Sequence, residues 1–225
     1  RIGLRLSKDE TIVRMPFEVR HMGSKYPIFS FDFTGAKRGV LPASYDYLRL
    51  EGRMQYRLNL PPIGYSQLML EGGKIFGKVP YLLLKLHEGN GTYFYDRYAF
   101  SCMNFYEFSS DAWISFFYEH HFNGFLLGRV PLLKKLNWRE VFVFKGVYGT
   151  LSARNDGSLP NTKAVMLFPV GMSSVEHPYL ETGFGIENIF RLLRVDCIWR
   201  LTHHRAVPGL SIPTFTVNFS LNLKF

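Results

Sequence analysis

The last twelve residues of the chain, 214–225, alternate without a break between polar and apolar side chains. A period of two places successive residues on opposite faces of a β-strand, so this segment predicts a strand with one apolar and one polar face. Its length suits a strand that crosses a lipid bilayer at a tilt, which needs about 9–11 residues. The apolar set consists of Phe215, Val217, Phe219, Leu221, Leu223 and Phe225.

A second segment, residues 46–60, repeats this period with charged residues at many of the polar positions. A soluble sheet leaves such a face in solvent, whereas in a membrane barrel it points into the lumen while the apolar face contacts lipid. The following residues 61–64, Pro-Pro-Ile-Gly, predict a tight turn, because proline ends a ladder and glycine permits the turn. The polar positions are Arg49, Glu51, Arg53, Gln55 and Arg57.

The composition argues against membrane-spanning helices. Aromatic residues make up 16% of the chain while mean hydropathy is only −0.03, so apolar and polar residues are interspersed. A helical span needs a run of about 18 or more apolar residues, and the apolar stretches of this sequence are short and carry charges. Because only helices and closed barrels satisfy the backbone in lipid, a soluble β-protein or a membrane barrel remains. The aromatic last residue of a regular strand favours the barrel.

Seven weaker patterns also predict strands, at 1–7, 26–34, 65–76, 111–122, 139–151, 180–189 and 193–202. Together with 46–60 and 214–225 they give about nine strands, an odd number, whereas single-chain bacterial barrels have even counts. We therefore expect an all-β fold, an antiparallel transmembrane β-barrel of about sixteen strands, with residues 1–225 as its C-terminal part and further sequence before Arg1. The residues expected to face the lumen are Arg49, Glu51, Arg53, Arg57 and Glu119. Those within 46–60 are expected to pair with carboxylates on neighbouring strands.

The lengths of the connections test this arrangement. If Phe225 ends in the periplasm, the turns 61–64 and 190–192 are periplasmic, and outer-membrane barrels have short periplasmic turns and longer external loops. Two connections, 8–25 and 123–138, are long for periplasmic turns, so either they fold back along the rim or the strand count is wrong there. The external connections are 35–45, 77–110, 152–179 and 203–213.

Chemical motifs are scarce. The net charge of +9 is spread along the chain rather than clustered, so no nucleic-acid partner is expected. The pairs His120-His121 and His203-His204 are adjacent, and neighbouring residues of a strand point to opposite faces. Cys102 and Cys197 lack the spacing of metal ligands and are expected to be unbridged. No hydrolase or phosphate-binding motif is present. We therefore expect no enzyme activity, catalytic residue, metal or cofactor.

The connection 77–110 is the most informative loop. Connections longer than about 12–15 residues without secondary structure are usually functional or disordered, and the aromatic content of this one argues against disorder. Its backbone polar groups need partners, which a polar lumen provides. We expect part of it to lie inside the barrel against strands near Glu119 and Glu140, with Arg97 paired to Glu119. An alternative is that it caps the outer mouth or binds a partner chain. The candidate lumenal residues are Tyr95, Asp96, Arg97 and Tyr98.

Four segments, Gly77–Tyr81, Thr92–Phe100, His120–Val141 and Gly183–Phe190, closely resemble a family of Bacteroidota outer-membrane proteins of unknown function. The resemblance extends from about residue 26 to residue 225. It implies a carboxypeptidase-regulatory-like β-sandwich domain ahead of a C-terminal barrel, and location in the bacterial outer membrane. The implied partners are outer-membrane lipid, including lipopolysaccharide, and other envelope proteins.

More distantly, the order of elements is similar to the second half of the sixteen-stranded barrels of the BamA/TamA superfamily, which insert or translocate outer-membrane proteins. In those barrels a loop with an Arg-Gly-aromatic tip enters the lumen. By position Arg97-Tyr98 stands in for that tip, although the glycine is absent, and Lys145 stands where an aspartate is usual. The resemblance implies a role in assembly or translocation of envelope proteins. A transporter or channel, or a structural subunit of a larger outer-membrane complex, are the alternatives.

Overall fold

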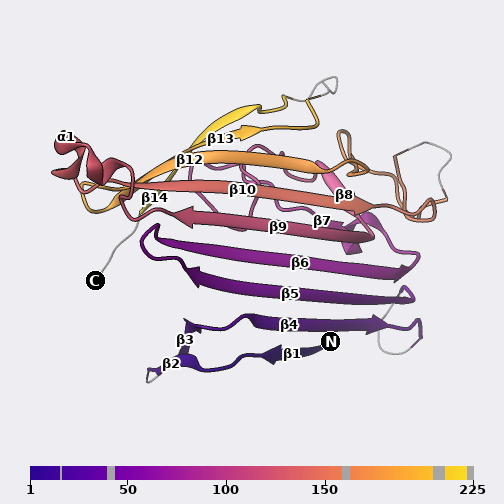
Figure 1. The fold of residues 1–225 in the computed structure, drawn as a ribbon. Coiled ribbons are helices and arrows are strands. Elements are labelled where there is room, and N and C mark those ends of the chain that lie inside the picture. Colours follow the sequence, from indigo (N-terminus) through magenta and orange to yellow (C-terminus); the bar gives the residue numbers. More distant parts are fainter. Residues whose placement is uncertain (16, 40–43, 159–162, 205–210, 222–225) are drawn as a thin grey trace.

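The computed structural model describes residues 1–15, 17–39, 44–158, 163–204 and 211–221. It confirms an all-β chain built on one antiparallel sheet, and each of the nine predicted segments contributes one strand to it (Figure 1). The strands, in their order across the sheet, are β1 (Ile2–Leu6), β4 (Ile28–Ala36), β5 (Tyr47–Asn59), β6 (Tyr65–Gly77), β9 (Ala112–His121), β10 (Arg139–Thr150), β12 (Tyr179–Ile189), β13 (Leu193–Arg200) and β14 (Phe215–Leu221).

The register gives the sheet two chemically different faces. In one row across the strands Phe29 pairs with Met54 and Met54 with Leu70, while one residue along the strands Ser30 pairs with Arg53 and Arg53 with Glu71. Since side chains alternate across a strand, one face is apolar and the other polar and charged. The apolar face keeps many large side chains exposed, among them Phe29, Phe31, Phe33, Leu48, Ile114, Tyr148, Phe184, Trp199, Phe215, Phe219 and Leu221.

The last strand follows the predicted alternation as far as it is described. Phe215, Phe219 and Leu221 are exposed on the apolar face, whereas Asn218 is fully buried on the other. Val217, half-buried, shares the parity of the phenylalanines. Leu223 and Phe225, also expected on the apolar face, lie outside the described residues. β1 and β14 are the two ends of the strand order. Closure of the sheet into a barrel, with more strands, stays a prediction.

Short elements occupy the two connections that were too long for simple turns. Residues 8–25 contain a hairpin of β2 (Glu10–Arg14) and β3 (Val19–Ser24), and residues 123–138 contain the 3-10 turn η2 (Leu127–Arg129) and the helix α1 (Pro131–Lys134). The strand count of the large sheet is therefore correct, and the additional length folds locally. No helix within the described residues is long and apolar enough to cross a membrane.

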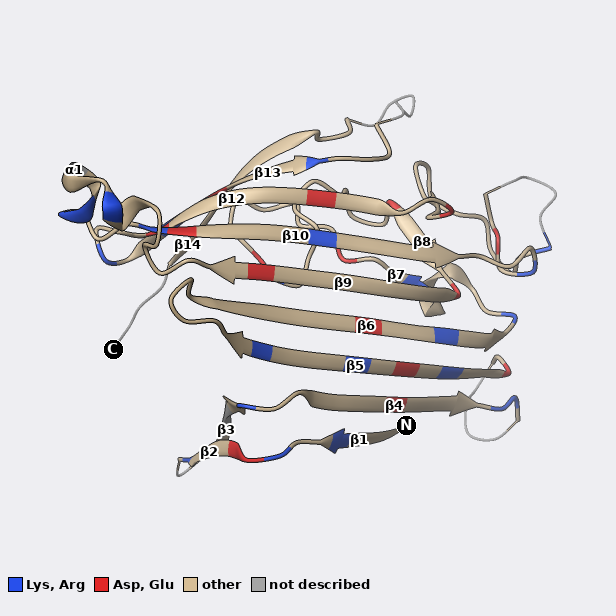
Figure 2. Cartoon of the chain, in the orientation of Figure 1, with Lys and Arg blue, Asp and Glu red and all other residues tan. Residues whose placement is uncertain are grey.

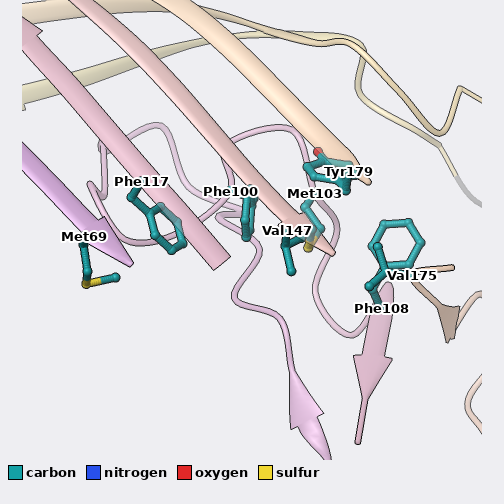
Figure 3. Packing of buried hydrophobic residues seen from close by; sticks show 8 residues of the cluster. All are labelled: Met69, Phe100, Met103, Phe108, Phe117, Val147, Val175 and Tyr179. Carbon is teal, nitrogen blue, oxygen red and sulfur yellow. The ribbon is translucent and has the colours of Figure 1, made fainter. Parts of the chain in front are cut away.

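The core lies on the polar side of the sheet, where the connection 77–110 covers the middle strands. In Figure 1 this connection passes behind β9, β10 and β12. It contains η1 (Tyr81–Leu83), β7 (Lys85–Leu86) and β8 (Phe108–Ser110), and β7 and β8 form a small sheet with β11 (Ser173–Ser174). Elements of two or three residues leave no periodic signal in the sequence. The main apolar cluster, drawn in Figure 3, is Met69, Phe100, Met103, Phe108, Phe117, Val147, Val175 and Tyr179.

Candidate functional site

The charged residues of the strands lie in their middle as well as at their ends, as Figure 2 shows for β5, β6, β10 and β12. Most of those that share the polar face are buried because the connection 77–110 lies over them. Burial of a charge is costly unless the charge is paired and hydrogen-bonded. The contacts between this connection, called the inner loop below, and the polar face therefore form the candidate functional site.

Glu119 is at the centre of the site. Its side chain is only 2% exposed. Besides His121 of the same strand, whose Nε2 lies 3.4 Å from Oε2, it has three partners from other parts of the chain. Arg97 Nε of the inner loop lies 2.7 Å from Oε2, and Arg194 Nη2 of β13 lies 3.2 Å from Oε1. The hydroxyl of Tyr95 also donates to Oε1. The pairing predicted between Arg97 and Glu119 is thus present, and it connects the inner loop to β9.

Lys145 of β10 fixes the same part of the inner loop from the other side. Its ammonium donates to the backbone carbonyls of Asp96, at 2.7 Å, and Ala99, at 2.5 Å. It also lies 4.5 Å from the centroid of the Tyr95 ring, which the guanidinium of Arg194 approaches to 4.4 Å. Lys145 therefore holds the backbone of the loop, a role that only a hydrogen-bond donor can perform.

A second group of contacts holds the loop further along, near Cys102. Glu181 accepts hydrogen bonds from the backbone N–H groups of Ser101 and Cys102, at 2.8 and 2.7 Å. Arg200 pairs with Glu107, with Nη2 at 2.6 Å from Oε1, and donates to the carbonyl of Cys102. Strand side chains thus provide the partners that buried backbone groups require. The sequence pattern does not indicate Glu181 or Arg200, since each is one polar residue in a weakly alternating strand.

The row of charges on β5 is arranged partly as expected. Arg53 pairs with Glu71 on the neighbouring strand, with Nη2 at 2.6 Å from Oε2, as predicted. Arg49 instead pairs with Glu51 two residues along its own strand, at 2.6 Å. Arg57 has no carboxylate partner among the described residues and stacks on the ring of Tyr65, 4.1 Å from its centroid. The expectation of cross-strand carboxylates was therefore wrong for Arg49 and Arg57, because nearer partners are available.

The remaining loop candidates divide into two groups. Asp96 is exposed and caps the backbone N–H of Tyr98 at 2.8 Å, while the ring of Tyr98 meets that of Phe117 edge-on at 6.2 Å. The expected position of the loop near Glu140 is wrong. Glu140 alternates with the buried residues of β10, so it lies on the opposite face, where it accepts a hydrogen bond from the backbone of Leu127.

The inner loop also bonds to the edge of the last strand. Phe219 donates its backbone N–H to the carbonyl of Tyr93 at 2.7 Å, and its carbonyl accepts the N–H of Tyr95 at 2.8 Å. The side-chain amide of Asn218 donates to the carbonyl of Thr92 at 3.0 Å. The two backbone bonds form a single β-bridge between Phe94 and Phe219, at the edge of β14 that does not face β13. The pattern of the sequence contained no sign of this contact.

No group of His, Cys, Asp and Glu suited to a metal ion occurs among the described residues. Cys102 and Cys197 are unbridged, which confirms the prediction made from their positions. Burial raises the pKa of the Cys102 thiol to about 12, so at neutral pH it stays protonated. A protonated thiol is a poor nucleophile and a poor metal ligand, and Cys102 is therefore a packing residue of the loop.

The burial of His87 should make the free energy of unfolding depend on pH in the acid range. Burial, assisted by the charge of Lys85, lowers its pKa from 6.5 to about 3. Below pH 6.5 the unfolded chain binds a proton that the folded chain does not, so stability is lost progressively as pH falls towards 3. Chemical unfolding at pH 7, 5 and 4 should show a steeper loss for the native chain than for His87→Gln. Equal slopes would mean that other groups control the acid response.

Comparisons with known proteins place the chain in a family. A search of curated proteins finds no match. The model described as "Family of unknown function (DUF5686) C-terminal domain" matches residues 2–153, which is more than half of the chain. That match includes six strands of the large sheet and the whole inner loop. The Bacteroidota origin, the N-terminal domain and the likeness to the BamA/TamA superfamily stay predictions. The chain belongs to the DUF5686 family of unknown function and carries its C-terminal domain.

Proposed function

We propose that this chain is the C-terminal part of an outer-membrane β-barrel whose lumen holds the inner loop. The observation that carries the proposal is the contrast between the two faces of the sheet. One face exposes rows of Phe, Leu, Ile and Trp side chains, and the other buries ion pairs beneath the loop. Membrane barrels have this combination, with lipid outside and a polar interior.

A soluble sheet explains the same faces less well. Monomeric soluble proteins rarely expose continuous apolar patches larger than a few hundred Å². Here exposed apolar side chains occur on strands at both ends of the sheet, including Phe31 on β4, Phe184 on β12 and Phe215 on β14. A soluble sandwich would use this face, not the charged one, as its core. Lipid is therefore the covering that fits the side chains.

The proposed role is assembly or translocation of envelope proteins, with other envelope proteins and lipid, including lipopolysaccharide, as partners. Its support is the inner loop, which Glu119, Lys145, Glu181 and Arg200 hold against the polar face along much of its length. A loop with so many anchors obstructs the space that a wide pore needs. A transporter or channel is the second candidate, and a structural subunit of a larger outer-membrane complex is the third.

Location is tested with the full-length protein in its own envelope. We expect it in the outer-membrane fraction and expect its unheated form to migrate differently from its boiled form in detergent electrophoresis, because closed barrels resist detergent until heated. A matched variant, Phe184→Leu, should behave in the same way. Recovery in a soluble fraction, with no change of migration on heating, would reject the membrane proposal.

The role is tested separately. Depleting the protein should lower the amount of other folded outer-membrane proteins, while solute uptake remains unchanged. In planar bilayers the purified full-length protein should show little steady conductance, and replacing residues 90–98 by a short Gly-Ser linker should increase it. Steady conductance of the intact protein, with normal levels of other barrels after depletion, would favour the channel.

A further inference from the structure

A cavity of about 430 Å³ lies between the polar face and the inner loop, beside the ion pair of Arg97 and Glu119. Strands β4, β5, β6 and β9 form its floor, and Arg97 and Tyr98 of the loop form one wall. Residues 23–26, at the end of β3 and directly after it, contribute to another wall. This volume is within the range of small-molecule sites, about 300–1,000 Å³.

Positive charge exceeds negative charge around the cavity. Its charged lining residues are Lys25, Arg57, Arg97 and Glu119. Glu119 already binds Arg97, Arg194 and Tyr95, so its negative charge is compensated by these partners. Neither Lys25 nor Arg57 contacts a carboxylate in the part of the chain that the structure describes. The stack on Tyr65 orients the Arg57 guanidinium, which leaves its N–H groups available for an anion.

The floor of the cavity contains two amides that lack good partners. Oε1 of Gln67 is buried and accepts no hydrogen bond from the described residues. Nε2 of Gln55 donates to the sulfur of Met69 at 3.7 Å, and a thioether is a weak acceptor. A buried acceptor without a donor is unfavourable. The floor therefore lacks one donor for Gln67 and one strong acceptor for Gln55.

An aromatic surface completes the lining. Tyr98 and Tyr26 are each 41% exposed, and the edge-on contact with Phe117 holds the ring of Tyr98 in place. These rings present flat apolar surface beside the polar amides and the arginine. A matching ligand is amphipathic, with a compact ring, several hydroxyl groups and one anionic group.

We propose that this cavity binds an acidic sugar. The carboxylate would pair with Arg57, one hydroxyl would donate to Gln67, another would accept from Gln55, and the ring would lie against Tyr98. Hydroxyl groups suit this pair of amides because each can donate and accept. The inference goes beyond the proposed function and does not depend on it, since the lining residues are the same whether lipid or water covers the other face.

The test is calorimetric titration of the purified full-length protein with D-glucuronate, with D-glucose and inorganic phosphate as comparison ligands. We expect one glucuronate site and at least tenfold weaker binding of glucose and phosphate. Arg57→Gln and Gln67→Leu should each weaken glucuronate binding at least tenfold. Arg49→Gln is the matched control, because Arg49 lies on the same strand face but outside the cavity, and it should leave affinity unchanged.

The comparison ligands also show which results would contradict the proposal. Equal binding of phosphate and glucuronate would mean a simple anion site, and equal binding of glucose would mean that Arg57 does not select an acid. Absence of glucuronate binding by the folded protein would overturn the proposal. If Arg57→Gln does not fold, Arg57→Lys keeps the charge but loses the paired N–H geometry, and it should still weaken binding at least threefold. Unchanged affinity in that variant would also contradict the proposal.

Discussion

Replacing Phe184 by arginine should destabilise the protein by about 2–4 kcal/mol, the cost of a lipid-facing arginine near the middle of a membrane barrel. Phe184 is 60% exposed at the centre of β12 and has no charged neighbour in its cross-strand row. The measurement is reversible unfolding of the full-length protein in lipid vesicles with urea. The control, Phe184→Leu, should change the free energy of unfolding by far less.

The same substitution distinguishes lipid from water as the surroundings of the apolar face. At an exposed position in water, substitutions usually change stability by less than about 0.5 kcal/mol. A near-zero effect of Phe184→Arg, together with an equally small effect of Ile114→Arg, would mean that solvent or another soluble layer covers this face. Either outcome bears only on what covers the apolar face, and neither changes the strand order described above.

Replacing Glu119 by glutamine should cost about 3–5 kcal/mol, mainly because it leaves the buried Arg194 charge with less compensation, with a smaller contribution from Arg97, whose side chain is 37% exposed. Arg194 is 3% exposed and retains Asp196, whereas Arg97 loses its carboxylate partner. Hydrogen exchange should therefore increase most in residues 92–99 of the inner loop. The experiment compares unfolding free energy and exchange rates in the native and variant proteins.

Glu51→Gln is the appropriate control for this variant. Glu51 is on the same polar face and pairs with Arg49, but both side chains are about a quarter exposed. Pairs in contact with water contribute less than about 1 kcal/mol, so this change should be small. A similar loss for both variants would contradict the view that burial gives Glu119 its importance. An unchanged hydrogen-exchange rate in residues 92–99 of the Glu119→Gln variant would contradict the view that Glu119 anchors the inner loop.

The sequence was sufficient to predict the strands of the large sheet because each has one apolar and one polar face, which gives its residues a period of two. The alternation of Leu48 and Leu50 with Arg49 and Glu51 is of this kind. The position of Arg97 beside Glu119 could also be predicted, since a long aromatic loop with a charge needs a buried partner of opposite sign.

Other parts of the site could not be predicted in this way. Glu181 accepts backbone N–H groups about 80 residues earlier in the chain, and no local pattern indicates such a contact. Glu140 appeared suitable as a partner because it has a carboxylate near β9, but its position along β10 places it on the wrong face. Contacts to backbone groups depend on the path of the loop, which side-chain chemistry alone does not determine.

The bridge between the inner loop and β14 has a consequence for the order of folding. Asn218 and Thr92 are 126 residues apart, so their contact closes one of the longest loops in the chain. Contacts of this kind form slowly, because the entropy of closing the loop is lost before the contact contributes stability. The N–H of Phe219, which donates to Tyr93, should therefore become protected from exchange later during refolding than the N–H groups of β14 that pair with β13.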